Sequence, residues 1–149
     1  MTGKTALRAY LRLQGAAGSE KVAMAAAAAA GHLAGLPGPR LADVQTAVSE
    51  ACLNAFEHGN LERPSVPVLL TFTIQGRNFK VAIRDQGSGF QPAAVPKPDL
   101  SRQLAGSSSD RGWGLYLMRQ LADRVQVRPG RRGCSVELYF HLNEEVTAS

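Results

Sequence analysis

The sequence predicts an α+β fold, a two-layer sandwich in which helices cover one face of a mainly antiparallel, mixed sheet. Several runs alternate apolar and polar residues with the period of a half-buried strand, and three other runs repeat apolar residues with the period of a helix. At 149 residues and 44% hydrophobic content the chain suits one core, so we expect a single domain over residues 1–149.

The first part of the chain predicts a strand and two helices. Alternation in TALRAYLRL places one row of side chains inward: Leu7, Ala9, Leu11 and Leu13. Ser19 is the expected N-cap of an alanine-rich helix that Gly35 ends, and its small side chains favour close packing on a neighbour. A second helix is expected from about Leu41 to His58, with Gly59 just past its end.

The second part predicts two hairpins separated by a loop and a helix. VLLTFTI and FKVAIRD form the first hairpin around QGRN, and VQVR and CSVELYF form the second around PGRRG. Residues 91–111 are rich in proline and serine and too long for an ordinary connection, which indicates a lid, a binding loop or a disordered segment. The third helix is expected to follow the glycines of RGWGLYLMRQLADRV, with a buried stripe that ends at Val125.

Composition narrows the function classes. The net charge is +5, but the basic residues are scattered, so we expect no direct nucleic-acid binding; a basic pI fits anionic ligands equally well. No apolar run is long enough to span a membrane and the N-terminus lacks a signal-peptide pattern, so a cytoplasmic protein without membrane contact is expected. Cys52 and Cys134 have no metal-site or disulfide spacing and are interpreted as buried, inert thiols.

The second helix carries a line of polar residues beside its buried stripe: Glu50, Asn54 and His58. A carboxylate and an amide one turn apart suit a divalent cation and an activated nucleophile, because the amide oxygen ligates Mg²⁺ and the carboxylate accepts a proton. A solvated helix face would give the same pattern. His58 is stabilised by the helix dipole alone and is left out of the site.

Two further motifs fit an anionic, planar ligand. Asp85 ends an inward-facing row, where an acid needs a donor such as the amino group of adenine, and Gly87 and Gly89 let the backbone approach a ring. Gly112 and Gly114 precede a helix whose N–H groups suit phosphate oxygens. Ordinary turns explain each motif alone, but in this order they are the parts that an ATP site needs.

In these motifs the chain resembles the GHKL (Bergerat-fold) ATP-binding domains, and among them the bacterial anti-sigma-factor serine kinases. SEACLNAFEHGN is similar to the N box of that family, and DQGSG and RGWGLYL to its two glycine boxes. The resemblance implies that Glu50 is the general base, that Asn54 holds Mg²⁺ on the ATP phosphates, and that Asp85 binds the adenine amino group beside Gly87 and Gly89.

The second glycine box and the last hairpin complete the implied site. Gly112, Gly114 and the adjacent Leu115 match the phosphate-binding motif, and residues 91–111 match the ATP lid, in which Arg111 reaches the γ-phosphate. Cys134 departs from the family, which usually has a threonine there whose hydroxyl supports the adenine contact. Weaker adenine binding is therefore expected.

The resemblance implies a switch protein that uses ATP and Mg²⁺. Such proteins bind and block a sigma factor, or bind a STAS-type anti-anti-sigma protein and phosphorylate it on serine; we also expect a homodimer. One alternative is a non-catalytic ATP-binding module that sequesters its partner. Another is a histidine-kinase catalytic domain. The sequence argues against it, because no dimerising helix with a phosphorylatable histidine precedes the expected domain. A basic nucleic-acid module is the most different alternative and predicts salt-dependent DNA binding without ATP.

Overall fold

Four strands form one sheet in the order β1-β2-β4-β3, and every neighbouring pair is antiparallel. The computed structural model describes residues 5–15, 18–59, 63, 65–86 and 110–146. The strands are β1 (Thr5–Gln14), β2 (Pro67–Arg84), β3 (Arg124–Gly130) and β4 (Gly133–Val146).

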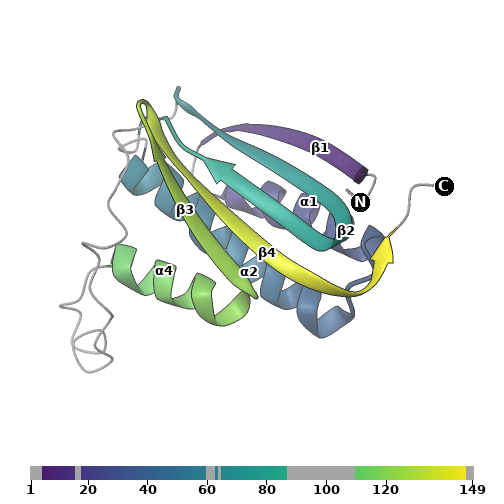
Figure 1. The fold of residues 1–149 in the computed structure, drawn as a ribbon. Coiled ribbons are helices and arrows are strands. Elements are labelled where there is room, and N and C mark those ends of the chain that lie inside the picture. The colour runs from purple at the N-terminus through teal and green to yellow at the C-terminus, as the bar shows by residue number, and fades with distance from the viewer. Residues whose placement is uncertain (1–4, 16–17, 60–62, 64, 87–109, 147–149) are drawn as a thin grey trace.

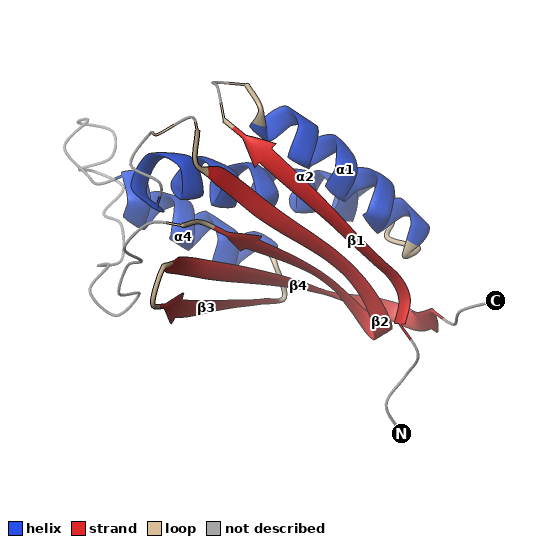
Figure 2. Ribbon diagram, turned by 90° about the horizontal axis from the view of Figure 1, so that it is seen from above, coloured by secondary structure: helices blue, strands red, loops and turns tan. Residues whose placement is uncertain are grey.

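Three helices lie on the same face of this sheet and leave its other face bare of described helices (Figures 1 and 2). They are α1 (Glu20–Leu33), α2 (Gly38–Asn54) and α4 (Asp110–Leu121), and a π-helical turn, η1 (Ala55–Gly59), follows α2 directly. This arrangement confirms the predicted α+β two-layer sandwich. No helix in the described ranges is long and apolar enough to cross a membrane.

The hydrophobic core fills the space between the helices and the sheet. The predicted inward rows of β2 and β4 are buried there: Val68, Leu70, Phe72, Ile74, Phe79, Val81, Ile83, Cys134, Val136, Leu138 and Phe140. The small residues of α1 do permit a close approach to α2, because a Cβ added to Gly31 would lie 2.9 Å from Leu41 Cδ2. Both cysteines are buried and unbridged, and burial raises the pKa of the Cys52 thiol to about 12.

The C-terminal end of α1 follows the local sequence signal closely. Gly35 has φ 92° and donates to His32 O, while Leu36 donates to Gly31 O, which is the hydrogen-bond pattern of a Schellman helix end. At the start, Ser19 occupies the N-cap position but makes no capping bond with its side chain. Glu20 Oε2 instead accepts a hydrogen bond from the Gly18 N–H at 3.0 Å.

The start of the second helix and the end of the third differ from the prediction. The second helix begins at Gly38 because Pro37 is extended and its carbonyl accepts the Leu41 N–H, so a proline in the first turn costs no hydrogen bond. The third helix ends at Leu121, before the predicted Val125. There the Asp123 N–H donates to Tyr139 O at 2.9 Å, which starts the pairing of β3 with β4.

The first predicted hairpin is present as the single element β2. Its ribbon turns back on itself (Figures 1 and 2) near Gly76, which has φ 59°. The half before this turn pairs with β1, and the half after it pairs with β4. Because Arg84 pairs with Ser135, the next residue, Asp85, leaves the sheet beside the start of β4. The second hairpin, β3 with β4, is confirmed, with Gly130 opposite Gly133.

Candidate active site

The end of α2 and the first turns of α4 meet at Gly114. A Cβ added to this glycine would lie 2.9 Å from Asn54 Nδ2 and 3.2 Å from Glu50 Oε2. Helix α4 therefore passes so close to both polar side chains that only a glycine fits without a shift. The structure thus brings two of the three predicted motifs together, and it leaves the Glu50 and Asn54 side chains half-buried between two helices.

The α-helix on which the polar line was predicted ends at Asn54. Asn54 is the last residue of α2, and η1 continues the chain with a wider turn than an α-helix has. The prediction that His58 shares a line with Glu50 assumed an unbroken α-helix, and the structure provides one for Glu50 and Asn54. Single π-turns are frequent at functional sites, and this one begins directly after Asn54.

Asp85 is buried, with 5% of its surface exposed, and it is held by the main chain of Cys134. The Asp85 N–H donates to Cys134 O at 3.0 Å, and Asp85 Oδ1 accepts the Cys134 N–H at 3.0 Å. A buried acid needs a hydrogen-bond donor, and the main-chain amide of Cys134 provides one for Asp85. This contact comes from the backbone, so it does not depend on whether residue 134 is cysteine or threonine.

Gly133 is a residue that the sequence-based site lacked. Its φ is 110°, and a Cβ there would lie 2.2 Å from Asp85 O and 2.9 Å from Asp85 Oδ1. A side chain would therefore displace the carboxylate as well as strain the backbone. The glycine at the end of the turn PGRRG was the available signal, but the sequence alone did not indicate that Asp85 packs on it.

Other predicted site residues are placed in part. Helix α4 begins at Asp110, so Gly112 and Gly114 lie inside its first turns and do not precede it, which corrects the prediction. Leu115 is 2% exposed and its side chain packs in the core, so a contact with a nucleotide would have to come from its backbone. Gly87, Gly89 and most of the expected lid, residues 91–109, lie outside the described residues, as does the side chain of Arg111.

The side chains at the end of α2 fit a cation that is shared with a ligand. No group of three or more His, Cys, Asp or Glu side chains gathers within the described part of the chain, so a metal cage made wholly by protein is not found there. Mg²⁺ commonly takes one or two protein oxygens and completes its shell with water and phosphate oxygens. The amide oxygen of Asn54 suits that role, because it lies beside the Glu50 carboxylate where both side chains face Gly114.

Replacing Gly114 with alanine is expected to alter the site while leaving the fold intact. Alanine favours a helix by about 1 kcal/mol over glycine, and this gain offsets the cost of displacing two side-chain ends, so we expect the stability of the variant to stay within about 1 kcal/mol of the wild type. The new methyl group pushes the Asn54 and Glu50 side chains aside, and we expect any activity that uses them to fall at least about tenfold. Urea unfolding and an activity assay measure the two effects; an unchanged activity would show that these side chains can move freely.

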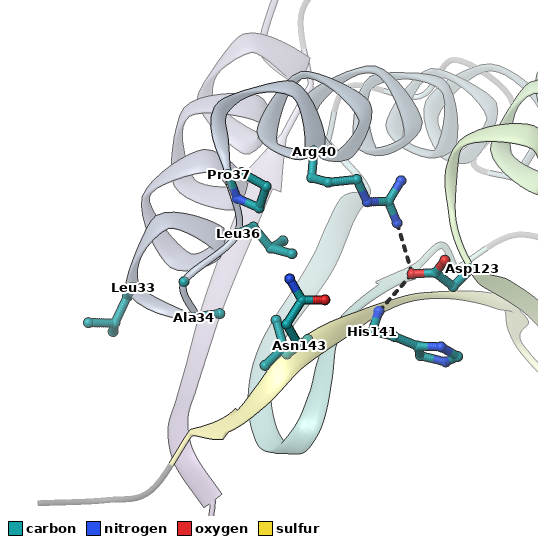
Figure 3. A pocket seen from close by; sticks show the side chains of 10 residues that line it. Leu33, Ala34, Leu36, Pro37, Arg40, Asp123, His141 and Asn143 are labelled. Carbon is teal, nitrogen blue, oxygen red and sulfur yellow. Dashed lines mark hydrogen bonds and ion pairs between the residues drawn. The ribbon is translucent and has the colours of Figure 1, made fainter.

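A pocket of 730 Å³ lies at the other end of α2, away from the predicted site. Figure 3 shows the Arg40 side chain and the main-chain nitrogen of His141 at its polar side, each joined to Asp123, while the imidazole of His141 points away from it. The Arg40 guanidinium lies 2.8 Å from Asp123 Oδ2, which also accepts the His141 N–H at 2.7 Å. Arg40 also donates to Leu121 O at 2.8 Å, so this network ties α2 to the end of α4 and to β4. None of the predicted site residues lines this pocket.

Comparison with known proteins gives a family and named relatives. The family described as "Histidine kinase-like ATPase domain" matches residues 16–140. Anti-sigma F factor of Anoxybacillus flavithermus is 33% identical over 112 residues, which cover 70% of this chain and 71% of that protein. Serine-protein kinase RsbW of Bacillus subtilis is 33% identical over 69% of this chain and 66% of its own length. Anti-sigma F factor of Geobacillus thermodenitrificans is 30% identical over 91% of this chain and 94% of that protein.

Solved structures share the fold. The structure of the RsbU and RsbW domains of Rv1364c from Mycobacterium tuberculosis superposes with a TM-score of 0.66 at 18% identity, covering 96% of this chain and 34% of that one. The SiaB-SiaC complex from Pseudomonas aeruginosa contains a chain with a TM-score of 0.60 at 11% identity, covering 89% and 88%. With the family match, these likenesses confirm the resemblance to GHKL-type domains.

Proposed function

Because the chain belongs to the histidine kinase-like ATPase domain family, we propose that it is an ATP-dependent serine protein kinase that acts as an anti-sigma factor. It binds and blocks a sigma factor, and it phosphorylates a serine of a STAS-type anti-anti-sigma protein. The names of its relatives, anti-sigma F factor and serine-protein kinase RsbW, support this proposal. We further propose that residues 1–149 form one domain with an ATP lid at 91–111, and that the protein acts as a cytoplasmic homodimer.

The observation that carries the proposal is the contact of Gly114 with Glu50 and Asn54. A carboxylate and an amide that both face a glycine near the start of a helix combine a proton acceptor, a hard oxygen ligand and main-chain N–H groups at one place. Phosphoryl transfer needs these three components, because its catalysis is mostly positioning and charge stabilisation.

In the proposed reaction Glu50 accepts the proton of the attacking serine hydroxyl. The serine oxygen forms a bond to the γ-phosphorus of ATP, and the bond between that phosphorus and the bridging oxygen breaks, with ADP as the leaving group. Asn54 would hold Mg²⁺, which neutralises charge on the phosphate oxygens when bound. The free N–H groups in the first turn of α4, as far as Gly112, would face the phosphates, with Arg111 at the γ-phosphate, while Gly114 keeps the helix close to Glu50 and Asn54.

The adenine end of the proposed site is formed by Asp85. Its Oδ1 accepts the Cys134 N–H, and a carboxylate offers about four acceptor positions, so an acid held in this way can bind a second donor such as the adenine amino group. Because Gly133 has no side chain, the Asp85 carboxylate can lie directly against it. Gly87 and Gly89 would border the adenine ring. Since the Cys134 amide supports Asp85 directly, we expect the loss of the usual threonine hydroxyl to weaken adenine binding without abolishing it.

The proposed function is tested by following the phosphate. We expect γ-labelled ATP with Mg²⁺ to label a STAS-domain partner on serine, as an acid-stable phosphate, and the label to disappear when the serine of that partner is replaced by alanine. Nucleotide affinity is measured in parallel with a fluorescent ATP analogue. Because phosphohistidine is lost in acid, acid treatment of the labelled partner distinguishes a serine kinase from a histidine kinase.

Each other outcome favours a stated alternative. Nucleotide binding without any label on the partner favours the non-catalytic module that sequesters its partner. Acid-labile label favours the histidine-kinase type. No nucleotide binding at all contradicts both the kinase and the ATP-binding module.

A further inference from the structure

The bare face of the sheet is strongly basic. Outward positions of the four strands alternate with the buried rows and carry six basic residues: Arg8, Arg12, Lys80, Arg84, Arg124 and Arg128. The turn between β3 and β4 adds the exposed Arg131 and Arg132. All three helices lie on the opposite face (Figure 2), so this charge faces outward.

Little acid balances these groups. Among the strand side chains that the structure describes on this face, Glu137 is the acid, and it contacts both Lys80 at 3.4 Å and Arg128. Burial alone would raise the pKa of Glu137, but the hydrogen bonds and positive charge of Arg128 and Lys80 outweigh it and hold the pKa below its usual range. Glu137 is therefore ionised and already neutralised, while Arg131 and Arg132 form no ion pair with a described carboxylate.

Two adjoining hollows shape the same face. One, of 460 Å³, is lined by Arg84, Gln86, Arg131 and Arg132, with Leu69 at its apolar side. The other, of 500 Å³, also includes Leu69 and Arg84 and extends over the outward-facing Thr71 and Ala82 of β2 towards Tyr10 and Arg12 of β1. The two therefore form one groove, with an aliphatic floor made of the outward-facing Leu69 and Ala82 and an arginine cluster, Arg84, Arg131 and Arg132, at one end.

We propose that this groove docks an acidic segment of a partner protein, whose carboxylates pair with the arginine cluster while its apolar side chains lie on the aliphatic floor. Charge complementarity selects such a partner, since arginine pairs with carboxylates through two parallel hydrogen bonds. The inference rests on the proposed function only in that it assumes a protein partner; it does not require phosphoryl transfer.

Two other occupants fit less well. A second copy of the chain would bring the same positive charges together, which costs binding energy. Single-stranded nucleic acid needs exposed aromatic rings for successive bases. Tyr10 is 73% exposed and could stack on a base. The ring of Tyr139 already has two cations near it, with Lys80 Nζ at 5.9 Å and Arg124 Cζ at 5.3 Å from its centre. A nucleic-acid backbone would also gain nothing from the aliphatic floor.

The docking site is tested by fluorescence anisotropy with a short labelled peptide in which glutamate alternates with leucine. The variant R131E/R132E reverses two charges in the arginine cluster, and K21E/R119E reverses two exposed charges on α1 and α4 as a matched control. We expect R131E/R132E to bind the peptide at least about tenfold more weakly and K21E/R119E to stay within about twofold of the wild type, with affinity that falls as salt rises.

The remaining outcomes overturn the proposal. Equal weakening by the two variants would show attraction by net charge alone. A labelled single-stranded oligonucleotide that binds more tightly than the peptide, and loses affinity in R131E/R132E, would assign the face to nucleic acid. No peptide binding up to about 1 mM would exclude a useful docking site. Nucleotide binding is measured in every variant, so a failure of the proposed kinase is seen separately from a failure of docking.

Discussion

Glu50→Gln is expected to slow phosphoryl transfer to serine about 10²- to 10⁴-fold while nucleotide affinity and stability stay within about twofold of the wild type. Glutamine keeps the size of the side chain and its contact with Gly114, but it cannot accept the proton of the attacking hydroxyl. Single-turnover transfer from labelled ATP measures the rate, and titration of a fluorescent ATP analogue measures the affinity.

Glu57 provides the matched control. It lies in the π-turn that follows the site, its side chain is exposed, and no catalytic role is proposed for it. Glu57→Gln therefore removes the same charge close to the site, and we expect it to leave transfer unchanged. If Glu50→Gln transfers phosphate at the wild-type rate, the general base is another group; if both variants are slow, the local charge and not proton transfer explains the effect.

Gly133→Ala is expected to lower the free energy of unfolding by about 2–5 kcal/mol and to weaken nucleotide binding in the molecules that remain folded. A non-glycine residue with positive φ costs about 1–2 kcal/mol, and overpacking a closed site adds about 1–3 kcal/mol. The new Cβ cannot be accommodated by a rotamer change alone, because its nearest contact is the main-chain oxygen of Asp85, at 2.2 Å. Urea unfolding followed by circular dichroism gives the stability.

Gly35→Ala distinguishes the cost of positive φ from the cost of overpacking. Gly35 has φ 92°, similar to the 110° of Gly133, but a Cβ added to it would meet no atom within 4 Å beyond its chain neighbours. We expect this variant to lose only the conformational part, about 1–2 kcal/mol, and to bind nucleotide normally. Equal losses in the two variants would mean that the contact with Asp85 contributes nothing and that the turn before β4 can relax.

The sequence predicted well those features that arise within one segment. The alternation of apolar residues in β2 and β4 predicted which side chains are buried, because a strand presents every second residue to the same face. The end of α1 at Gly35 was predicted for a similar reason, since the left-handed conformation there favours glycine. The start of α2 at Gly38 precedes the predicted Leu41, because a proline such as Pro39 is tolerated in the first turn of a helix.

The candidate site was predicted only as separate motifs. The spacing of Glu50 and Asn54 indicated a shared face, and the order of the motifs indicated an ATP site, but each motif also had an ordinary structural explanation. His58 was placed on the same line because the sequence offers no sign that the α-helix widens to a π-turn after Asn54. The catalytic and binding roles stay predictions that the experiments above test.

By itself the sequence determined the family, the α+β class, the inward rows of the strands and the identity of the polar residues offered for chemistry. Only the tertiary structure decided that Gly114 packs on Glu50 and Asn54, and that Gly133 packs on Asp85. The reason is physical: periodicity and glycine conformation act over neighbouring residues, whereas these contacts depend on how closely distant segments approach when the sheet and the helices bury their common core.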